Sequence, residues 1–328
     1  MDRSRSNHPR MNRNDLVTMT VSGQVAHPVS ASNPYRIGHD GVPRVLPGTG
    51  GVVTSHRIGD RCVGLAGDHI EPGVSLHNNK SEIVGKKNGP NLALLTYACI
   101  GNKAKVLTGP AKGKQGLVTG KHGGVAHLLL DFPKGVLENL RIGDQIQIQS
   151  RGLGLQLIDH PEVHLFSCSP ALIHRWNISS HQDHLRVPVT HFVPAAIMGS
   201  GIGRNNAVRG DYDIQLFDGR IRKKYRLGNL RFGDIVAILD SDTRYGRGYR
   251  GGTITIGVVV HGDSTVSGHG PGIMTLVSGA GQDIRPHISR NANIAVIFGI
   301  RPVLDQKSYR TLVRSRVPVK VARSVKAH

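Results

Sequence analysis

A pair of short apolar runs in the second half of the chain constrains the fold more than any other feature. The runs, 235–239 and 253–260, are rich in β-branched residues, are bounded by glycine and are too short for ordinary helices. They therefore predict two buried strands. The first run is followed by the sequence DSD and the second by HGD, with a glycine-flanked His269 shortly after. Because loops held by a rigid sheet commonly carry functional residues, we expect a site where these strands end.

An apolar-Gly-Asp phrase occurs three times, as RIGD at 57–60 and 141–144 and as RFGD at 231–234. Glycine permits the backbone of a tight turn and aspartate stabilises it, so each phrase predicts a turn that leads into a strand. Each aspartate is expected in a turn and an apolar residue after it in the core: Asp60 with Val63, Asp144 with Ile146, and Asp234 with Val236. With 42 glycines and only 4% aromatic residues, the chain is typical of a turn-rich β protein.

Two segments predict short helices. The sequence PNLALLTYACI at 90–100 begins with proline, which suits the first helical turn, and carries an apolar face that includes Leu92 and Leu95. A second helix is expected at 170–176. The surrounding sequence is rich in proline, histidine and polar residues, which indicates a domain boundary near residue 180.

These patterns predict a mostly β, two-part architecture, barrel- or sandwich-like, with few short helices. We divide the chain into a disordered basic start at 1–13, an N-terminal β domain at 14–180, a C-terminal β domain at 181–300 and a basic tail at 301–328.

The net charge of +20 is concentrated at the two ends. Residues 1–13 carry four arginines and one aspartate, and 301–328 carry eight lysines or arginines and one aspartate, so half of the excess lies there. A solvated tail and a weak polyanion-binding tail both explain this distribution. No apolar segment is long enough to span a membrane, and no secretory signal is visible. Three widely spaced cysteines favour a reduced, cytoplasmic protein.

The sequence GDHIEPG at 67–73 combines imidazole and carboxylate groups. In an extended chain His69 and Glu71 project to the same face, where they can ligate a metal ion or form an acid–base pair. The alternative is a turn in which Asp68 caps the backbone and His69 only fills space.

The sequence GDYDIQ at 210–215 places Asp211 and Asp213 on one face of a strand, with Tyr212 opposite. Two carboxylates on one face repel unless a cation or a proton joins them. The alternative is that Asp211 belongs to another Gly-Asp turn and only Asp213 faces inward.

Further candidates lie beside glycines. His122 and His127 flank a Gly-Gly turn, so that they can converge across a hairpin, although surface histidines also occur in such turns. His261 ends the second apolar run. Asp242 follows the first, but nearby arginines also favour a structural ion-pair network there.

The segment AKVLTGPAKGKQGLVTGKHGG, 104–124, resembles the KOW element of ribosomal and transcription-factor barrels. The resemblance rests on the valines, glycines and lysine at Val106, Gly109, Lys112, Gly113, Gly116 and Val118. It implies a loop that presents backbone and lysine to RNA, but such strands also serve as scaffold, and few aromatic residues are available for stacking on bases.

Taken together, eight phrases between residues 14 and 298 resemble the bacterial and archaeal family called domain of unknown function 4438. They are GDHIEPGVS, IGNKAKVLTGPAKGKQGLVTGKHGG, IGDQIQI, VPVTHFVPAAIMGSG, GDYDIQ, LRFGDIVAI, TITIGVVVH and GHGPG. This resemblance implies distinct N- and C-terminal parts and supplies no catalytic residues. A fainter likeness, through GDYDIQ, LRFGDIVAILD and HGDSTVSGHGPG, is to acetamidase/formamidase enzymes, which are metal-associated and hydrolyse small amides. LRFGDIV lacks the histidine that follows Gly-Asp in those enzymes.

We therefore expect metal-assisted hydrolysis of a small polar substrate, such as an amide with its C–N bond, in a homo-oligomeric protein. The expected cofactor is a divalent metal such as zinc. The expected ligands are His69, Glu71, Asp213 and His261, the expected general base is His269 or Asp242, and the other candidates are His122, His127 and Asp211. The alternatives are a non-catalytic RNA- or polyanion-binding protein that uses the KOW-like segment and basic ends, and a structural, oligomer-forming protein.

Overall fold

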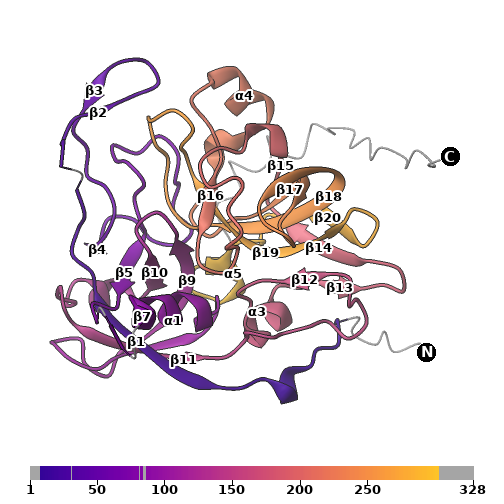
Figure 1. Ribbon diagram of the computed structural model, residues 1–328, viewed down its shortest axis with the longest axis horizontal. Helices are drawn as coiled ribbons and strands as arrows, with labels where there is room; N and C mark the ends of the chain where they lie inside the picture. The colour runs from indigo at the N-terminus through magenta and orange to yellow at the C-terminus, as the bar shows by residue number, and fades with distance from the viewer. Residues whose placement is uncertain (1–7, 31, 81, 84–85, 303–328) are drawn as a thin grey trace.

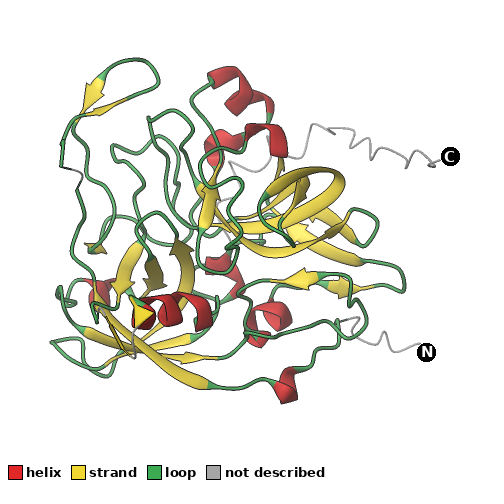
Figure 2. Ribbon diagram, in the orientation of Figure 1, coloured by secondary structure: helices red, strands yellow, loops and turns green. Residues whose placement is uncertain are grey.

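The computed structural model describes residues 8–302 apart from 31, 81, 84 and 85. Strands dominate it, and the helices are short (Figure 2). The predicted mostly β fold, with barrel-like sheets and few short helices, is confirmed. Within the described residues, no helix is long and apolar enough to cross a membrane.

Six antiparallel strands of the first half close into a barrel, at the lower left of Figure 1. Their order is β1-β11-β8-β9-β10-β5, and β5 pairs back onto β1. The strands are β1 (Met19–Val25), β5 (Gly73–His77), β8 (Lys103–Val106), β9 (Gln115–His122), β10 (His127–Asp131) and β11 (Gln145–Ser150). In β8 and in β11 as far as Gln149, exposed or half-buried polar residues alternate with buried apolar ones. Successive side chains point to opposite faces, and only one face fills the barrel.

Helix α1 (Gly89–Tyr97) packs over the barrel strand β1. The approach is close, since a Cβ atom on Gly23 of β1 would lie 2.9 Å from Cδ2 of Leu94. The prediction of a helix here is confirmed, but the helix ends at Tyr97 because Ala98 takes an extended conformation. Its buried face was predicted wrongly at Leu92, which is 39% exposed.

A second sheet, with the order β12-β19-β18-β17-β15 and with β16 also paired to β19, forms most of the other half. Its strands are β12 (His164–Leu165), β15 (His191–Pro194), β16 (Asp211–Asp213), β17 (Ile235–Asp242), β18 (Gly248–Val259) and β19 (Gly272–Ala280). The two apolar runs lie in β17 and β18, and β19 is buried along almost its whole length. The prediction that both runs are buried strands is confirmed.

The remaining elements are small. A third sheet contains β13 (Ser179–Ser180), β14 (Leu185–Val189) and β20 (Ile284–Ile288). Strand β4 (Val52–Val53) extends the barrel sheet. Two isolated strand pairs are β2 (Arg36–Ile37) with β3 (Pro43–Arg44) and β6 (Glu82–Ile83) with β7 (Lys86–Lys87). The other helices are α2 (Lys134–Leu137), α3 (Pro170–Arg175), α4 (Gly219–Lys224) and α5 (Ile294–Ile297), and the 3-10 turns are η1 (Arg13–Asp15), η2 (Ala195–Ile197) and η3 (Leu227–Asn229). Helix α3 matches the helix predicted at 170–176, and the Ser169 side chain caps it.

The three apolar-Gly-Asp phrases form the same turn. Gly59, Gly143 and Gly233 have φ angles of 95°, 87° and 81°, a backbone region that favours glycine. In each turn the aspartate accepts a hydrogen bond from the backbone N–H of the arginine three residues earlier, at 2.8, 2.9 and 2.9 Å. The glycine and the aspartate are thus both required by one local geometry.

Only the second and third of these turns lead directly into strands, namely β11 and β17. The first turn lies against the third, with an isolated bridge between Arg61 and Arg231. The prediction of a strand after Asp60 is therefore wrong, because that segment pairs with another turn and not with a hairpin partner. The apolar residues predicted to be buried are all buried: Val63, Ile146 and Val236.

The chain ends are placed only in part. Arg10 pairs with Asp159 at 2.5 Å, and Met11 forms a bridge with Leu157. The expected disordered start therefore does not extend over residues 8–13. Residues 1–7, and 303–328 of the expected basic tail, lie outside the described residues.

The two halves share structure across the boundary expected near residue 180. Strand β12 precedes it yet pairs with β19. Trp176, also before it, is buried in the same core as the second sheet. The segment that precedes residue 180 thus packs with the second half of the chain.

Candidate functional site

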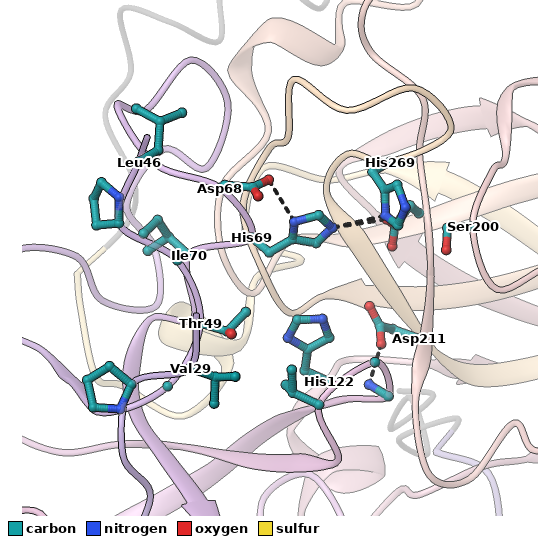
Figure 3. Close-up of a pocket in the computed structure, with 18 of the residues that line it drawn as sticks. Val29, Leu46, Thr49, Asp68, His69, Ile70, His122, Ser200, Asp211 and His269 are labelled. Atoms are coloured by element: carbon teal, nitrogen blue, oxygen red, sulfur yellow. Dashed lines mark hydrogen bonds and ion pairs between the residues drawn. The ribbon is translucent and has the colours of Figure 1, made fainter. Parts of the chain in front are cut away.

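The barrel and the second sheet meet at a cleft of about 1390 Å³ (Figure 3). Residues from both halves line it, among them His69 and His122 from the first half and Asp211, Asp213 and His269 from the second. Imidazole and carboxylate groups far apart in the sequence are thus brought to one place.

Strand β16 supplies the two carboxylates. Asp211 and Asp213 point to the same side, as predicted from the two-residue period of a strand, and both are buried. Tyr212 points to the other side, where its hydroxyl oxygen lies 3.2 Å from Oγ of Ser241. Asp211 also accepts a hydrogen bond of 2.7 Å from the backbone N–H of Gly123 in the barrel half. This contact joins the two halves at the site.

His261, directly after β18, is the most deeply buried of the histidines in this cluster, with 0% exposure. Its Nε2 atom lies 2.7 Å from Oδ2 of Asp211 and 3.4 Å from Oδ1 of Asp213. Neither carboxylate meets this nitrogen at a hydrogen-bonding angle, so Nε2 has no hydrogen-bond partner among the described residues. The other ring nitrogen, Nδ1, lies 3.0 Å from the carbonyl oxygen of Gly262. The ring is thus held by Nδ1 and presents Nε2 to two carboxylates.

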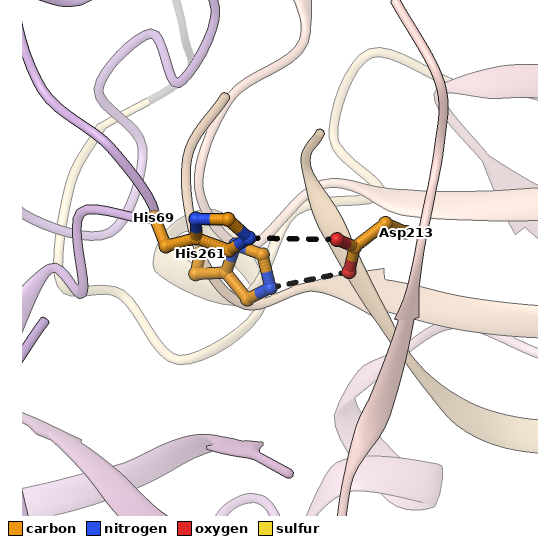
Figure 4. A group of neighbouring side chains, drawn as sticks. All are labelled: His69, Asp213 and His261. Atoms are coloured by element: carbon orange, nitrogen blue, oxygen red, sulfur yellow. Dashed lines mark ion pairs between the residues drawn. The ribbon is translucent and has the colours of Figure 1, made fainter. Parts of the chain in front are cut away.

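His69 enters the cluster from the barrel half (Figure 4). Its Nδ1 atom lies 2.8 Å from Oδ1 of Asp68, and its Nε2 atom lies 3.6 Å from Oδ2 of Asp213 and 3.1 Å from Nδ1 of His269. The backbone of His69 has a φ angle of 55°, which is uncommon for a residue with a side chain. The extended conformation from which we predicted that His69 and Glu71 project together is therefore wrong.

Glu71 lies behind the cluster and holds two further histidines. Its Oε1 atom lies 2.6 Å from Nδ1 of His122, and its Oε2 atom lies 2.9 Å from Nδ1 of His127. Glu71 also accepts hydrogen bonds from the backbone N–H of Gly50 and from the hydroxyl of Ser75, and it is fully buried. Its oxygens are thus occupied by protein donors. His122 and His127 are directly paired across β9 and β10, as the Gly-Gly turn predicted.

In the cluster, the pKa values of the carboxyl groups are lowered and the pKa of His261 is raised, so that opposite charges lie side by side. Burial lowers the pKa of His261, but Asp211 and Asp213 outweigh burial and raise that pKa well above its usual value. Burial raises the pKa of Asp213, but contacts with His261, His269 and His69 bring it well below its usual range. Burial also raises the pKa of Glu71, but His122 and His127 outweigh burial and lower that pKa. Because the carboxylates are ionised among imidazoles that attract protons, a cation and those protons compete for the same atoms.

Two overlapping groups of side chains have the composition of a metal site. One contains His69, Asp213 and His261, and the other contains His122, Asp211 and His261; in each, one ligand atom per residue lies within 4.8 Å of the others. Imidazole nitrogen and carboxylate oxygen are the donor set of zinc and related divalent ions. The outer nitrogens of these histidines face Asp68, Glu71 and the Gly262 carbonyl oxygen. Such outer partners orient metal-ligating histidines in known sites.

Comparisons with known proteins place the chain in a family. The family model described as "Domain of unknown function (DUF4438), N-terminal" matches residues 35–174, and the corresponding C-terminal model matches residues 175–298. The chain belongs to the DUF4438 family. A similar solved structure is the crystal structure of TM1086, with a TM-score of 0.82 and 40% sequence identity over 88% of this chain and 98% of that chain. No curated protein matches the chain. The resemblance to domain of unknown function 4438 is thus confirmed.

The candidate residues of this DUF4438 protein divide into three positions. The cluster itself contains His69, His122, Asp211, Asp213, His261 and His269. Glu71 and His127 lie behind it, where Glu71 meets only protein donors. Asp242 lies outside it and pairs with Arg244 and Arg250 at 2.8 and 3.2 Å, which is the structural network that the sequence offered as an alternative.

Sequence patterns missed three contributors to the site. Asp68 orients His69, although the motif pointed to Glu71. Gly272 leaves the space that the ligand atoms occupy, since a Cβ atom there would lie 2.1 Å from Oδ2 of Asp211 and from Nε2 of His261. Arg247 lines the cleft and does not join Asp242 in the ion-pair network. Gly272, which follows GHGP, was visible in the sequence as part of a glycine-rich loop, but only the fold shows that it faces the ligand atoms.

Proposed function

We propose that this protein is a metal-dependent hydrolase that acts on a small polar substrate, such as an amide. The observation that carries the proposal is the environment of His261. Its Nε2 atom is fully buried and lies 2.7 Å from Asp211 and 3.4 Å from Asp213, and these charged groups are stabilised when a proton on the ring or a metal ion joins them. Because imidazole and carboxylate are also the donor set of zinc, we take the joining group to be a metal ion. The candidate ligands are His69, Asp213 and His261, with His122 and Asp211 as a second set.

The two ligand sets share one atom, which limits the number of ions. Nδ1 of His261 faces the Gly262 carbonyl oxygen, so only Nε2 remains for an ion in either set. We therefore expect about one ion per chain, of a divalent metal such as zinc, that favours imidazole and carboxylate ligands.

A divalent ion supplies Lewis-acid polarisation of a carbonyl group and activates water near neutral pH. His269 is suited to move protons, because its side chain is 31% exposed to the cleft and its Nδ1 atom lies 3.0 Å from Oδ2 of Asp213. Hydrolysis of an amide adds the hydroxyl of water to the acyl carbon, breaks the C–N bond and transfers a proton to the leaving nitrogen. His269 takes and returns that proton in this scheme, and Asp213 orients its ring.

Metal analysis of protein purified without an affinity tag tests the proposal. We expect about one equivalent of a transition metal per chain, lost in His261→Ala and in His69→Ala. His164→Ala, at an exposed position on β12, is the matched control and retains the metal. A panel of small amides then tests turnover by the loaded protein. Wild-type protein that neither contains nor takes up a divalent ion would contradict the proposal.

The KOW-like segment supports the RNA-binding alternative only through its lysines. Lys103, Lys105, Lys112 and Lys114 are exposed and form no ion pair within the described part of the chain. Residues that carry the resemblance have structural roles: Val106 and Val118 are buried in the barrel, and Gly109 and Gly113 have φ angles of 71° and 85°. Scaffold requirements thus account for much of the motif, which favours the hydrolase proposal.

The expected compartment, oligomeric state and polyanion binding are part of the same proposal. The cysteines are free and buried at Cys62, Cys99 and Cys168, which is consistent with a cytoplasmic, reducing environment. A homo-oligomer and weak polyanion binding by the basic tail remain predictions.

A further inference from the structure

The cleft contains an arginine that forms no ion pair with a carboxylate among the described residues. Arg247, in the connection between β17 and β18, is 3% exposed and lines the cleft. Its guanidinium lies over the ring of Tyr212, 5.3 Å from the centroid, and reaches the carbonyl oxygens of Gly201 and Asn206 only at 3.4 and 3.3 Å. Its Nε atom has no hydrogen-bond partner among the described residues. A buried guanidinium in these surroundings is poorly compensated.

The neighbouring arginines, one in this connection and one at the start of β18, are paired. Arg244 and Arg250 both contact Asp242, at 2.8 and 3.2 Å, whereas Arg247 turns away from that carboxylate towards the cleft. Desolvation lowers the pKa of Arg247, although Asp211 acts on it at longer range in the opposite direction. The cleft therefore holds a positive charge whose nearest counter-charges belong to the candidate metal cluster.

Two further arginines increase this positive charge. Arg204 and Arg209 line the cleft, and neither forms an ion pair within the described part of the chain. Arg204 acts on Arg247 as a neighbouring like charge. Arg209 is linked through Gly210 to Asp211 of the cluster, and Nη2 of Arg247 lies 3.8 Å from the position of a Cβ atom on Gly210. Arg247 and Arg209 thus lie near Asp211 of the candidate metal cluster, and Arg204 lies near Arg247.

The barrel side of the cleft contributes apolar residues among polar ones. Val52, Val53, Ile70, Leu92 and Leu95 line the cleft on the barrel side. Figure 3 shows Ile70, Leu46 and Val29 on the side of the histidines away from His269 and Ser200. The cleft is therefore suited to a molecule that carries an anionic group and an apolar body.

We propose that the substrate is a small organic anion whose carboxylate or phosphate group is held by Arg247, with Arg204 and Arg209 beside it. The guanidinium group matches the geometry of these oxyanions through paired N–H donors. The bond to be hydrolysed then lies over the histidine–aspartate cluster, and the apolar body lies against the barrel wall. This assignment of substrate class rests on the proposed metal-dependent hydrolase.

Binding of matched probes to the full chain tests the assignment. Hexanoate and hexanamide have the same apolar body and differ in charge, and inorganic phosphate provides the other oxyanion. We measure all three by isothermal titration calorimetry on protein treated with chelator, where hexanamide is not hydrolysed, and the two anions also on zinc-loaded protein. We expect hexanoate or phosphate to bind at least about tenfold more tightly than hexanamide, the discrimination worth one well-placed charged hydrogen bond. Preference for hexanoate over phosphate identifies a carboxylate substrate, and the reverse identifies a phosphate.

Variants locate the binding group. Arg247→Met keeps the apolar stem and is expected to weaken anion binding about tenfold in both metal states. Arg220→Met removes the same charge at a position on α4 whose side chain is 96% exposed, and is expected to bind as the wild type does. Arg209→Gln, at a half-buried position, is the second variant if Arg247→Met does not fold, and is expected to weaken binding about threefold.

Two outcomes overturn the assignment of substrate class. One is hexanamide binding as tightly as both anions, and the other is unchanged anion binding in the folded arginine variants. Metal content measured on the same samples separates this proposal from the previous one. Protein that binds no metal but discriminates between the anion and the amide removes the hydrolase proposal and keeps the anion site. Protein that binds zinc without that discrimination removes only the anion site.

Discussion

Gly272 stands where any side chain would meet His261: a Cβ atom on Gly272 would lie 2.1 Å from Nε2 of that histidine. Gly272 is paired with Asp213 across β16 and β19, and its φ angle is not in the left-handed region. Glycine is therefore required here by space and not by backbone conformation. The free space coincides with the atoms that we propose as metal ligands.

We predict that Gly272→Ala abolishes metal binding and leaves the fold intact. The added methyl group displaces the ends of the Asp211 and His261 side chains, and the overpacking is expected to cost about 1–3 kcal/mol of stability. Metal content and thermal unfolding are the measurements. Gly248→Ala is the control, because its Cβ atom would meet nothing within 4 Å. Wild-type metal content in a folded Gly272→Ala variant would show that the ion is not held at these atoms.

Asp68 is predicted to set metal affinity without touching the ion. Its Oδ1 atom lies 2.8 Å from Nδ1 of His69, and loss of such an outer carboxylate lowers affinity about 10–100-fold. We expect Asp68→Asn to raise the Kd for zinc by that factor in a competition titration. Asp40→Asn, which removes a carboxylate paired with Arg44, is expected to leave the Kd unchanged. Equal affinities in the two variants would remove Asp68 from the site.

The stability of the fold is predicted to depend on pH through His191, which lies outside the candidate site. This residue is buried on β15, and burial lowers its pKa to about 4. The unfolded histidine titrates near its ordinary pKa, so between about pH 6.5 and pH 4 the unfolded chain binds the additional proton. The contribution of His191 to stability is therefore fully present above this window and is lost as the pH falls through it.

We expect the wild-type protein to lose on the order of 3 kcal/mol more stability than His191→Gln on acidification through that window. Urea unfolding of both proteins at several pH values measures the difference. Parallel losses of stability in the two proteins would show that His191 does not titrate between the two states.

Local rules of the chain predicted a large part of this structure. The period of two in a strand predicted that Asp211 and Asp213 share a face, and the Gly-Gly turn predicted that His122 and His127 meet. The Gly-Asp phrases predicted turns, because one backbone geometry requires both residues. Each of these predictions depends on residues that are close in sequence.

What the sequence did not predict depends on conformation or on contacts between distant segments. His69 has a positive φ angle, so alternation failed at GDHIEPG and the partner of His69 is Asp68 instead of Glu71. The sequence did predict that His69 and Asp213 come together as ligands of one metal ion, and they lie 3.6 Å apart, but the contact between the barrel and the second sheet that brings them together is encoded in no local pattern. For the same reason, spacing could not show that Asp242 pairs with Arg244 and Arg250, or that Arg247 forms no ion pair among the described residues.

The basic tail is predicted to contribute charge and not fold stability. Arg301 pairs with Asp60 at 2.6 Å, so a truncation that tests the tail begins after Pro302. We expect removal of 303–328 to leave the Tm and the metal content unchanged. Binding to RNA by the full chain is expected to be weak and to fall steeply with salt, because counterion release dominates such binding. Sequence-selective binding that survives about 0.3 M salt would favour the RNA-binding alternative.

His269 is predicted to separate catalysis from metal binding. It is the most exposed histidine that contacts Asp213, with a side chain 31% exposed, whereas that of His261 is 1% exposed. His269→Gln is therefore expected to keep the metal and to lower kcat about 100-fold or more, the usual effect of removing a general acid–base group. The assay uses the small amide that the wild type hydrolyses fastest. His39→Gln, at an exposed position, controls for the loss of an imidazole. A His269→Gln variant that loses its metal would identify His269 as a ligand, and one with wild-type kcat would exclude it from proton transfer.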